Sequence, residues 1–252
     1  MTILDELLDS VAASATVAQT VDVCIGGHWS GVTVRLDGEL RGGLASTLGG
    51  GGDDHHHGGG PPVRAAGQLH TLPVPELLAL ARSQSLLEAS VGFATLNALL
   101  DTPPNCVDIN AAELIAERGA GRKVAIVGHF PFTPRIHEAA GTLWVLELHP
   151  REGDTPATRA PEILPQADVV AITGTALLNH TLDALLSYCH ADAYVLVLGG
   201  TTPLSPVLFR HGISALSGTI VIEPETALRA ISQGATFKQI GGKRLVTWFR
   251  EA

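Results

Sequence analysis

Short polar segments rich in glycine, threonine and histidine recur in the second half of this 252-residue sequence. Each lies at the end of an apolar run. Their residue types suit ligand binding: Gly128, His129 and Phe130; Glu147; Thr173, Gly174, Thr175 and Asn179; and Gly200, Thr201 and Thr202. If the apolar runs are parallel strands, these residues share one edge of a sheet. Open parallel sheets bind their ligands there, beyond the carboxyl ends of the strands.

The two threonine-rich loops indicate a site for an anion or a metal chelate. Thr173–Thr175 precedes a helical pattern over Leu177–Cys189, and Gly200–Thr202 precedes another over Leu204–Phe209. Hydroxyls and free backbone N–H groups at helix N-termini bind anions. Capping of the helices by threonine, worth about 1 kcal/mol per cap, is the simpler alternative. We favour a ligand because both loops are expected at the same edge.

His129 adds a group suited to metal binding or acid–base chemistry, with Glu147 or His149 as a second ligand. A hydrogen-bonded structural role is the alternative. Glu147 follows Gly128 by 19 residues, close to the spacing of about 20 at which an acid contacts a ribose hydroxyl in dinucleotide-binding domains. The loop reads GHFPF, however, where such domains have GxGxxG, so ordinary NAD binding is disfavoured.

A second candidate for metal binding is the run His55, His56 and His57 in the segment GGGGDDHHHGGGPP. Its composition suits borderline metals. Three consecutive residues cannot all face one ion without further ligands, so a solvated loop is the alternative. These residue types leave the cofactor unknown; a divalent or heavy metal is the candidate, at His129 or at the histidine run.

Composition limits the class of protein. The chain is 45% hydrophobic and 16% charged, with a net charge of −9, which allows a large core but no basic surface for nucleic acid. Three scattered cysteines favour neither a disulfide framework nor a thiolate zinc site. The first ten residues lack the pattern of a signal peptide, and no apolar run approaches the ~18 residues that span a membrane. We expect a cytoplasmic protein with a small-molecule or metal ligand and no nucleic-acid or membrane partner; a homo-oligomer stays open.

The elements that position these residues fall into two parts. The first domain, residues 1–102, is expected to be α+β, with a β-meander followed by helices. Its predicted elements are a helix over Ile3–Ala13, strands over Ala18–Ile25, Gly31–Leu36 and Leu44–Leu48, a helix starting near Pro75, and a helix over Leu86–Leu100. Pro103 and Pro104 then end the helical pattern and mark the domain boundary.

The second domain, residues 103–252, is expected to be α/β with a mostly parallel open sheet. Continuous apolar runs, separated by helical stretches such as Thr181–Cys189, are typical of strands buried on both faces. After a helix over Ala111–Glu117, the runs are Lys123–Gly128, Leu143–Leu148, Ala167–Thr173, Ala193–Gly199 and Gly218–Ile222, with a last strand over Arg244–Phe249. We expect this sheet to be separate from the strands of the first domain.

Five segments, in this order, resemble a known family. They are GLASTL (Gly43–Leu48), VGFATLNALL (Val91–Leu100), VAIVGHFPF (Val124–Phe132), ITGTALLNHTLDALL (Ile172–Leu186) and LGGTTPLSPVLFRHGISALSG (Leu198–Gly218). Together they are similar to the heavy-metal chelation domain family, a family of unknown function. The resemblance implies a first domain like the N-terminal domain of enolase, a Rossmann-like second domain, and a ligand site in the cleft between them. It also implies that Asn97 faces this site; a hydrogen bond from its helix to a loop is the alternative.

Two functions stay open. The first is binding of a metal, a metal chelate or a small anionic metabolite in the interdomain cleft. The second is a transferase-type enzyme with a nucleotide-like cofactor, in which Glu147 contacts a ribose and His129 acts as acid or base. An enzyme needs a titratable group within reach of a reacting atom, whereas a binding protein needs only complementary donors.

Overall fold

The computed structural model describes residues 1–48 and 63–251 and divides the chain into two compact units. The first unit contains Ile3–Thr102 together with Thr219–Arg244. The second contains Pro103–Gly218 and residues 245–251. The chain passes into the second unit between Thr102 and Pro103 but returns to the first for 26 residues, a return that no sequence pattern indicated. The histidine run His55–His57 lies outside the described residues.

Three antiparallel strands form the centre of the first unit: β1 (Gln19–Ile25), β2 (Trp29–Leu36) and β3 (Glu39–Ser46). Asp37 and Gly38 connect β2 to β3, and their φ angles of 52° and 83° match the two-residue hairpin turn that Asp-Gly favours. The third strand therefore begins directly after this turn, earlier than the Leu44 start expected from the apolar residues.

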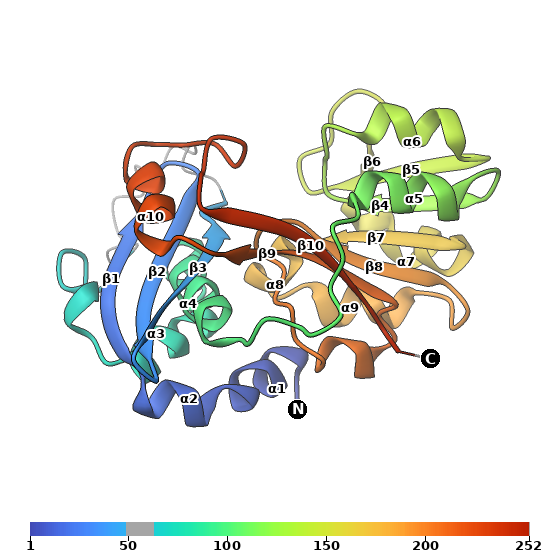
Figure 1. The fold of residues 1–252 in the computed structure, drawn as a ribbon. Helices are drawn as coiled ribbons and strands as arrows, with labels where there is room; N and C mark the ends of the chain where they lie inside the picture. The colour runs from blue at the N-terminus through green and yellow to red at the C-terminus, as the bar shows by residue number, and fades with distance from the viewer. Residues whose placement is uncertain (49–62, 252) are drawn as a thin grey trace. The chain divides into compact units, whose positions relative to one another are not determined.

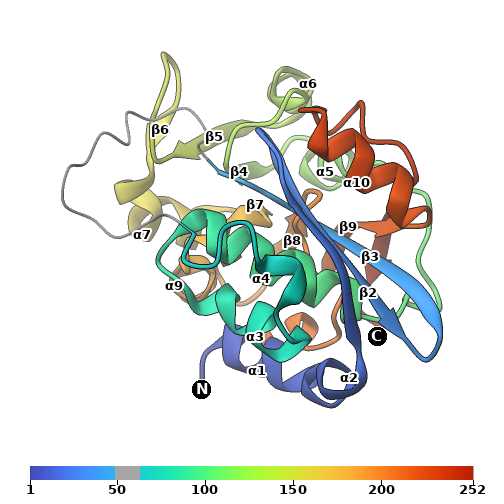
Figure 2. The same cartoon turned by 90° about the vertical axis from the view of Figure 1, so that its left-hand side faces the viewer.

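Helices cover both faces of these strands (Figures 1 and 2). The helices of the unit are α1 (Ile3–Ser10), α2 (Ala12–Val17), α3 (Val74–Ala79), α4 (Leu86–Leu99) and α10 (Pro224–Ser232). A Cβ atom at Gly43 would lie 2.0 Å from the carbonyl oxygen of Ala94, so α4 packs directly on one face of β3. On the other face a Cβ atom at Gly31 would lie 2.9 Å from the Leu228 side chain of α10. The glycines let both helices approach the sheet closely.

Six consecutive strands, β4 to β9, are parallel where they lie in the second unit. They are β4 (Lys123–Val127), β5 (Thr142–Glu147), β6 (Thr155–Pro156), β7 (Val169–Thr173) and β8 (Tyr194–Leu198), followed by β9 (Ala215–Val221), which starts here. Their order is β9-β8-β7-β4-β5-β6, and every neighbouring pair is parallel. From β4 the chain goes outward to β5 and β6, then crosses back to β7 on the other side of β4. The direction of winding thus reverses between β4 and β7.

Helices also cover this parallel sheet (Figure 1). They are α5 (Ala111–Gly119), α6 (Thr133–Ala139), α7 (Ala160–Ile163), α8 (Thr175–Leu178) and α9 (Leu182–Tyr188). Leu114 and Ile115 of α5 and Ile136 of α6 form one core cluster with Val124 and Ile126 of β4. On the opposite side of the sheet, α7 and α9 pack against each other.

The helical patterns that follow the two threonine loops are shorter than expected. The pattern over Leu177–Cys189 is divided into α8 and α9, because His180 between them has a left-handed φ of 59°. The pattern over Leu204–Phe209 gives only one turn of 3-10 helix, Leu208–His211. Prolines at positions 203 and 206 account for this, since each removes a backbone N–H donor.

The expectation of two separate sheets is wrong. β9 pairs in parallel with β8 through residues such as Ala215, and its last residue, Val221, pairs antiparallel with Gly42 of β3. β10 (Lys243–Phe249) also pairs with β9, so all ten strands form one mixed sheet rather than a mostly parallel one. The apolar run at Gly218–Ile222 did not reveal a strand long enough for two sets of partners. The fold is mixed α/β, and the enolase-like and Rossmann-like descriptions stay predictions.

Two expectations about the chain as a whole can be compared with the structure. Cys24, Cys106 and Cys189 are all free, as their spacing predicted. Among the described residues, no helix has the length and apolar character needed to cross a bilayer.

Candidate functional site at the ends of the parallel strands

The reversal of winding between β4 and β7 marks a place for a ligand. Loops that leave neighbouring strands there turn toward opposite faces of the sheet, which opens a crevice between them. The loop after β4 begins at Gly128, and the loop after β7 begins at Gly174. The structure therefore puts two of the predicted segments at the reversal.

The loops after β4, β7 and β8 are packed side by side. Gly128 has a φ of 101°, and a Cβ atom there would lie 3.0 Å from the Thr173 side chain. A Cβ atom at Gly174 would lie 2.5 Å from the Oγ1 atom of Thr202. Only glycine permits these approaches without displacement of the neighbouring loop. We call the surface formed by Gly128–Phe130, Thr173–Thr175 and Gly200–Thr202 the rim.

The threonines of the rim differ in how their hydroxyls are bonded. The Oγ1 atoms of Thr173 and Thr175 lie 2.9 Å apart, and the Thr175 backbone N–H donates to Thr173 Oγ1 at 3.3 Å. Thr173 thus satisfies a donor at the start of α8, although the N-cap residue itself is Gly174, which has no side chain to cap the helix. Thr201 and Thr202 are buried, and the Thr202 hydroxyl has no hydrogen-bond partner among the described residues. A buried hydroxyl in this state costs about 1–3 kcal/mol unless a ligand or water reaches it.

The short helices weaken one part of the sequence argument. α8 has four residues, and no α-helix follows Gly200–Thr202 directly. Such segments offer individual hydroxyl and N–H groups but no helix dipole of useful size. The rim can therefore contact an anion through donors of the loops only.

His129 lies beside a carboxylate that the sequence analysis missed. Its Nδ1 atom is 3.6 Å from Oδ2 of Asp154. The Asp154 side chain is 6% exposed and the His129 side chain 38%. The backbone N–H of Arg151 donates to the same Asp154 oxygen at 3.0 Å, which fixes the carboxylate in a turn through Gly153. This turn precedes the two-residue strand β6, and an acid after a glycine turn was the only signal for it in the sequence.

The other predicted residues are held by local hydrogen bonds. Glu147 ends β5, and its Oε2 atom accepts from the Leu148 backbone N–H at 3.1 Å. Asn179 accepts a hydrogen bond from the Thr181 hydroxyl at 2.7 Å. Within the described part of the chain, no hydrogen bond or ion pair joins Glu147 to His129. Glu147 lies near the rim because its strand, β5, pairs with β4. Its carboxylate is not paired with His129.

Phe130 and Phe132, in the loop after β4, pack against the core of the second unit. Their rings are stacked, with centroids 5.0 Å apart and an angle of 15° between the planes. Both rings pack on the core cluster of α5, α6 and β4. They therefore contribute apolar surface at the base of the rim, where sequence analysis placed Phe130 for ligand contact.

Asn97 belongs to the first unit. It lies near the end of α4, and its side-chain amide donates to the Leu44 carbonyl oxygen at 3.0 Å. The alternative was a hydrogen bond from the helix to a loop, whereas the observed bond goes to strand β3. A role of Asn97 toward the rim stays a prediction.

A complete protein metal site is absent from the described residues. In residues 1–48 and 63–251, no three His, Cys, Asp or Glu side chains come together in a geometry that could hold an ion. The rim has His129 with Asp154 behind it, and Glu147 on the neighbouring strand end. A metal bound here would need further ligands besides those that the described residues bring together.

Two family models together match most of this chain. A family model described as "Putative heavy-metal chelation", DUF364, matches residues 110–249, and a second model with the same description, DUF4213, matches residues 5–100. The first match alone spans more than half of the chain. The chain belongs to the DUF364 family. Within this family member, the first match contains every segment of the rim.

Two solved structures of DUF364 proteins share the fold of this chain. A protein of unknown function from the DUF364 family of Pyrococcus horikoshii superposes with a TM-score of 0.82 at 21% identity, covering 99% of this chain and 100% of that one. A DUF364 protein from Desulfitobacterium hafniense gives 0.77 at 25% identity, covering 98% and 100%. An uncharacterized protein of Methanocaldococcus jannaschii is 30% identical over 163 residues, 61% of this chain. The match spans 62% of that relative's length.

Proposed function

We propose that the second unit binds a metal ion together with a small anionic chelating molecule at the rim. The observation that carries this proposal is the pair His129 and Asp154 beside the reversal of winding. Three features support it in turn: the histidine beside a carboxylate, an incomplete set of ligands among the described residues, and the unbonded Thr202 hydroxyl of the rim.

The orientation of His129 suits a metal ligand. A histidine that binds a metal usually donates a hydrogen bond from its other ring N–H group, often to a carboxylate. This bond fixes the ring and makes the ligand nitrogen more basic. The Nδ1 atom of His129 faces the buried Asp154 carboxylate at 3.6 Å. The Nε2 atom is then the one left for an ion, and imidazole suits zinc, copper, iron and nickel.

The incomplete ligand set favours a chelate over a bare ion. Zinc in protein sites takes four ligands. His129, even with Glu147, leaves at least two positions for an outside molecule. A small polycarboxylate or similar anion fills these positions, and its remaining oxygens accept hydrogen bonds from groups such as the Thr202 hydroxyl.

The transferase alternative has no observation in its favour. Neither the family description nor the names of the relatives mention an enzymatic activity. The Glu147 carboxylate accepts from its neighbour's backbone N–H. Binding requires only the donors that the rim has, so we keep binding as the function.

The proposal predicts stronger binding of a chelate than of its components. Isothermal titration with Zn(II), citrate and the Zn(II)–citrate complex should show the complex binding at least tenfold more tightly than either component. His129→Ala should reduce this affinity at least tenfold, and Asp154→Asn by about tenfold, the usual effect of a lost carboxylate behind a ligand histidine. Thr202→Val should reduce it about fivefold, the value of one neutral hydrogen bond.

Two controls make the titration specific. All variants are built with His55, His56 and His57 replaced by alanine, so that metal bound by the histidine run does not contribute. His137→Ala removes an exposed histidine of α6 and should leave the affinity unchanged. If zinc alone binds as tightly as its citrate complex, or if His129→Ala has no effect, the rim is not a chelate site.

A further inference from the structure

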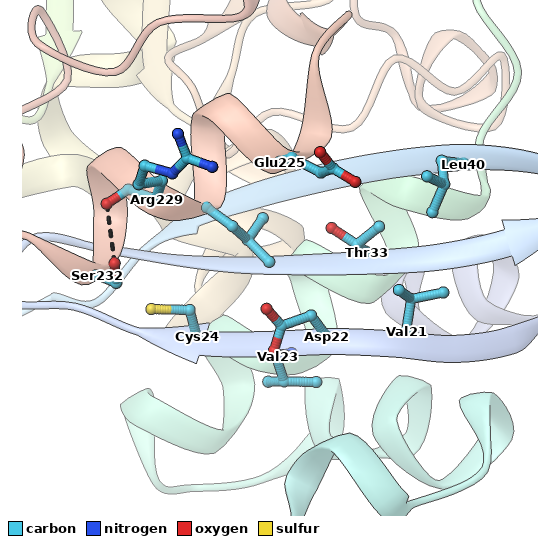
Figure 3. Close-up of a pocket in the computed structure, with 10 residues that line it drawn as sticks. Val21, Asp22, Val23, Cys24, Thr33, Leu40, Glu225, Arg229 and Ser232 are labelled. Atoms are coloured by element: carbon cyan, nitrogen blue, oxygen red, sulfur yellow. Dashed lines mark hydrogen bonds between the residues drawn. The ribbon is translucent and has the colours of Figure 1, made fainter.

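A second candidate site lies in the first unit, in a groove between α10 and strands β1 and β2 (Figure 3). The groove has a volume of about 550 Å³, which is within the ~300–1,000 Å³ range of small-molecule sites. Asp22 and Cys24 of β1 and Thr33 of β2 lie along the sheet, and Glu225 and Arg229 of α10 lie opposite. Asp22 and Thr33 are direct cross-strand partners, so they share this face.

Thr33 is the feature that distinguishes this groove from an ordinary surface depression. The residue is 2% exposed, and its hydroxyl has no hydrogen-bond partner among the described residues. Figure 3 shows it in the middle of the groove, between Glu225 and Asp22. Buried hydroxyls are nearly always bonded in folded proteins, so an unbonded one that lines a groove indicates a missing partner.

The charges around the groove are opposite in sign but not paired. Glu225 and Arg229 are four residues apart on α10, the spacing at which an acid and a base commonly form an ion pair. In the described part of the chain, no ion pair joins Arg229 to Glu225 or to Asp22. One cationic and two anionic groups therefore face the same space without neutralising each other.

We propose that this groove binds a small aliphatic α-amino acid or a similar zwitterion. The ligand's carboxylate contacts Arg229, its ammonium group lies between Asp22 and Glu225, and the Thr33 hydroxyl bonds one of the two. Its aliphatic part lies on Val21, Leu40 and Leu228, which also line the groove.

The state of Cys24 agrees with binding and not with covalent chemistry. Burial, and then the negative charge of Asp22, raise the pKa of the Cys24 thiol above its usual value. The protonated thiol is a weak nucleophile. It serves here as a small, polarisable part of the wall.

Three probes with the same isobutyl chain test the proposal by titration calorimetry in the presence of EDTA. L-leucine carries both charges, 4-methylpentanoate lacks the amine, and isoamylamine lacks the carboxylate. Leucine should bind, and each of the other two should bind at least tenfold more weakly, because each loses one charge-assisted contact.

Substitutions in the groove test which residues contact the bound leucine. Arg229→Gln should weaken leucine binding at least tenfold, and Thr33→Val about fivefold without loss of melting temperature, since the substitution removes an unbonded buried hydroxyl. Thr33→Ser keeps the hydroxyl and should bind leucine normally, even if the valine variant folds poorly. Arg122→Gln, an exposed change in the second unit, is the matched control and should have no effect.

Three results would overturn the proposal. The first is no binding of leucine at millimolar concentration. The second is equal binding of leucine and isoamylamine, which would indicate a site for cations. The third, measured without EDTA, is binding of Zn(II) that disappears in Cys24→Ser, which would make the groove a metal site. None of these results bears on the rim, whose test uses a metal chelate and other variants.

Discussion

Glu88 shows how single residues determine the stability of the first unit. It is 3% exposed, and it accepts hydrogen bonds from the Arg64 guanidinium, the Arg64 backbone N–H and the Ser83 hydroxyl. Burial alone raises the pKa of the Glu88 carboxyl, but these bonds outweigh burial and lower the pKa from 4.5 to about 2. The charged form is therefore favoured in the folded state.

The pKa of Glu88 predicts a pH dependence of stability. Because the folded pKa is below the unfolded one, the contribution is complete above about pH 4.5 and is lost as the pH falls toward 2. Glu88→Gln should lower the free energy of unfolding at pH 7 by about 2 kcal/mol, a value reduced for the exposure of Arg64 to solvent. Urea unfolding at pH 7 and at pH 3 measures both effects.

The variant should lose less stability between pH 7 and pH 3 than the unchanged protein, because the titrating group is gone. Glu76→Gln removes an exposed acid of α3 and serves as the control, with an expected change within about 0.5 kcal/mol. Identical losses in Glu88→Gln and in the unchanged protein would show that Glu88 does not hold its pKa near 2.

At the level of elements, close packing of α4 on β3 depends on Gly43. A Cβ atom there would lie 2.0 Å from the Ala94 carbonyl oxygen and 2.4 Å from the Ala98 nitrogen, both backbone atoms that cannot rotate away. Gly43→Ala should therefore lower the free energy of unfolding by about 3 kcal/mol or more. Thermal unfolding followed by circular dichroism measures this loss.

Gly27→Ala is the matched control for Gly43→Ala. A Cβ atom at Gly27 meets nothing within 4 Å, so the expected change is within about 0.5 kcal/mol. Similar effects of the two substitutions would mean that α4 moves away from β3 at little cost. The contact at Gly43 would then not be what holds the helix in place.

At the level of the whole molecule, the return of Thr219–Arg244 to the first unit has a consequence for folding. The segment contains α10, whose Ala227, Leu228 and Ile231 are buried. A fragment of residues 1–102 exposes the apolar face of β1–β3 that α10 covers. We expect this fragment to lack cooperative thermal unfolding.

Joining residues 219–244 to the fragment through a Gly/Ser linker should restore a cooperative transition, because α10 again covers the sheet. The same fragment with Leu228→Asp and Ile231→Asp in the added segment is the control. It should not show a cooperative transition. Cooperative unfolding of residues 1–102 alone, with unchanged stability, would show that the first unit is complete without α10.

The sequence by itself determined most of the local elements and the position of the rim. The apolar runs of β4, β7 and β8 predicted strands buried on both faces, and the apolar α4 a buried helix. Parallel strands end at one edge, so the glycine and threonine segments that follow them had to lie together. These conclusions need only periodicity and the order of elements, which local residue types encode.

The tertiary structure alone decided the rest. The pairing of β9 with both β8 and β3 depends on strand register. The return of Thr219–Arg244 to the first unit depends on how α10 packs on the sheet. The contact between His129 and Asp154 joins residues that are 25 positions apart. The unbonded Thr33 hydroxyl in its groove arises from the packing of α10, nearly 200 residues later, on the same strands. Such contacts form wherever the packed elements bring side chains together, and no pattern within a short stretch of sequence specifies them.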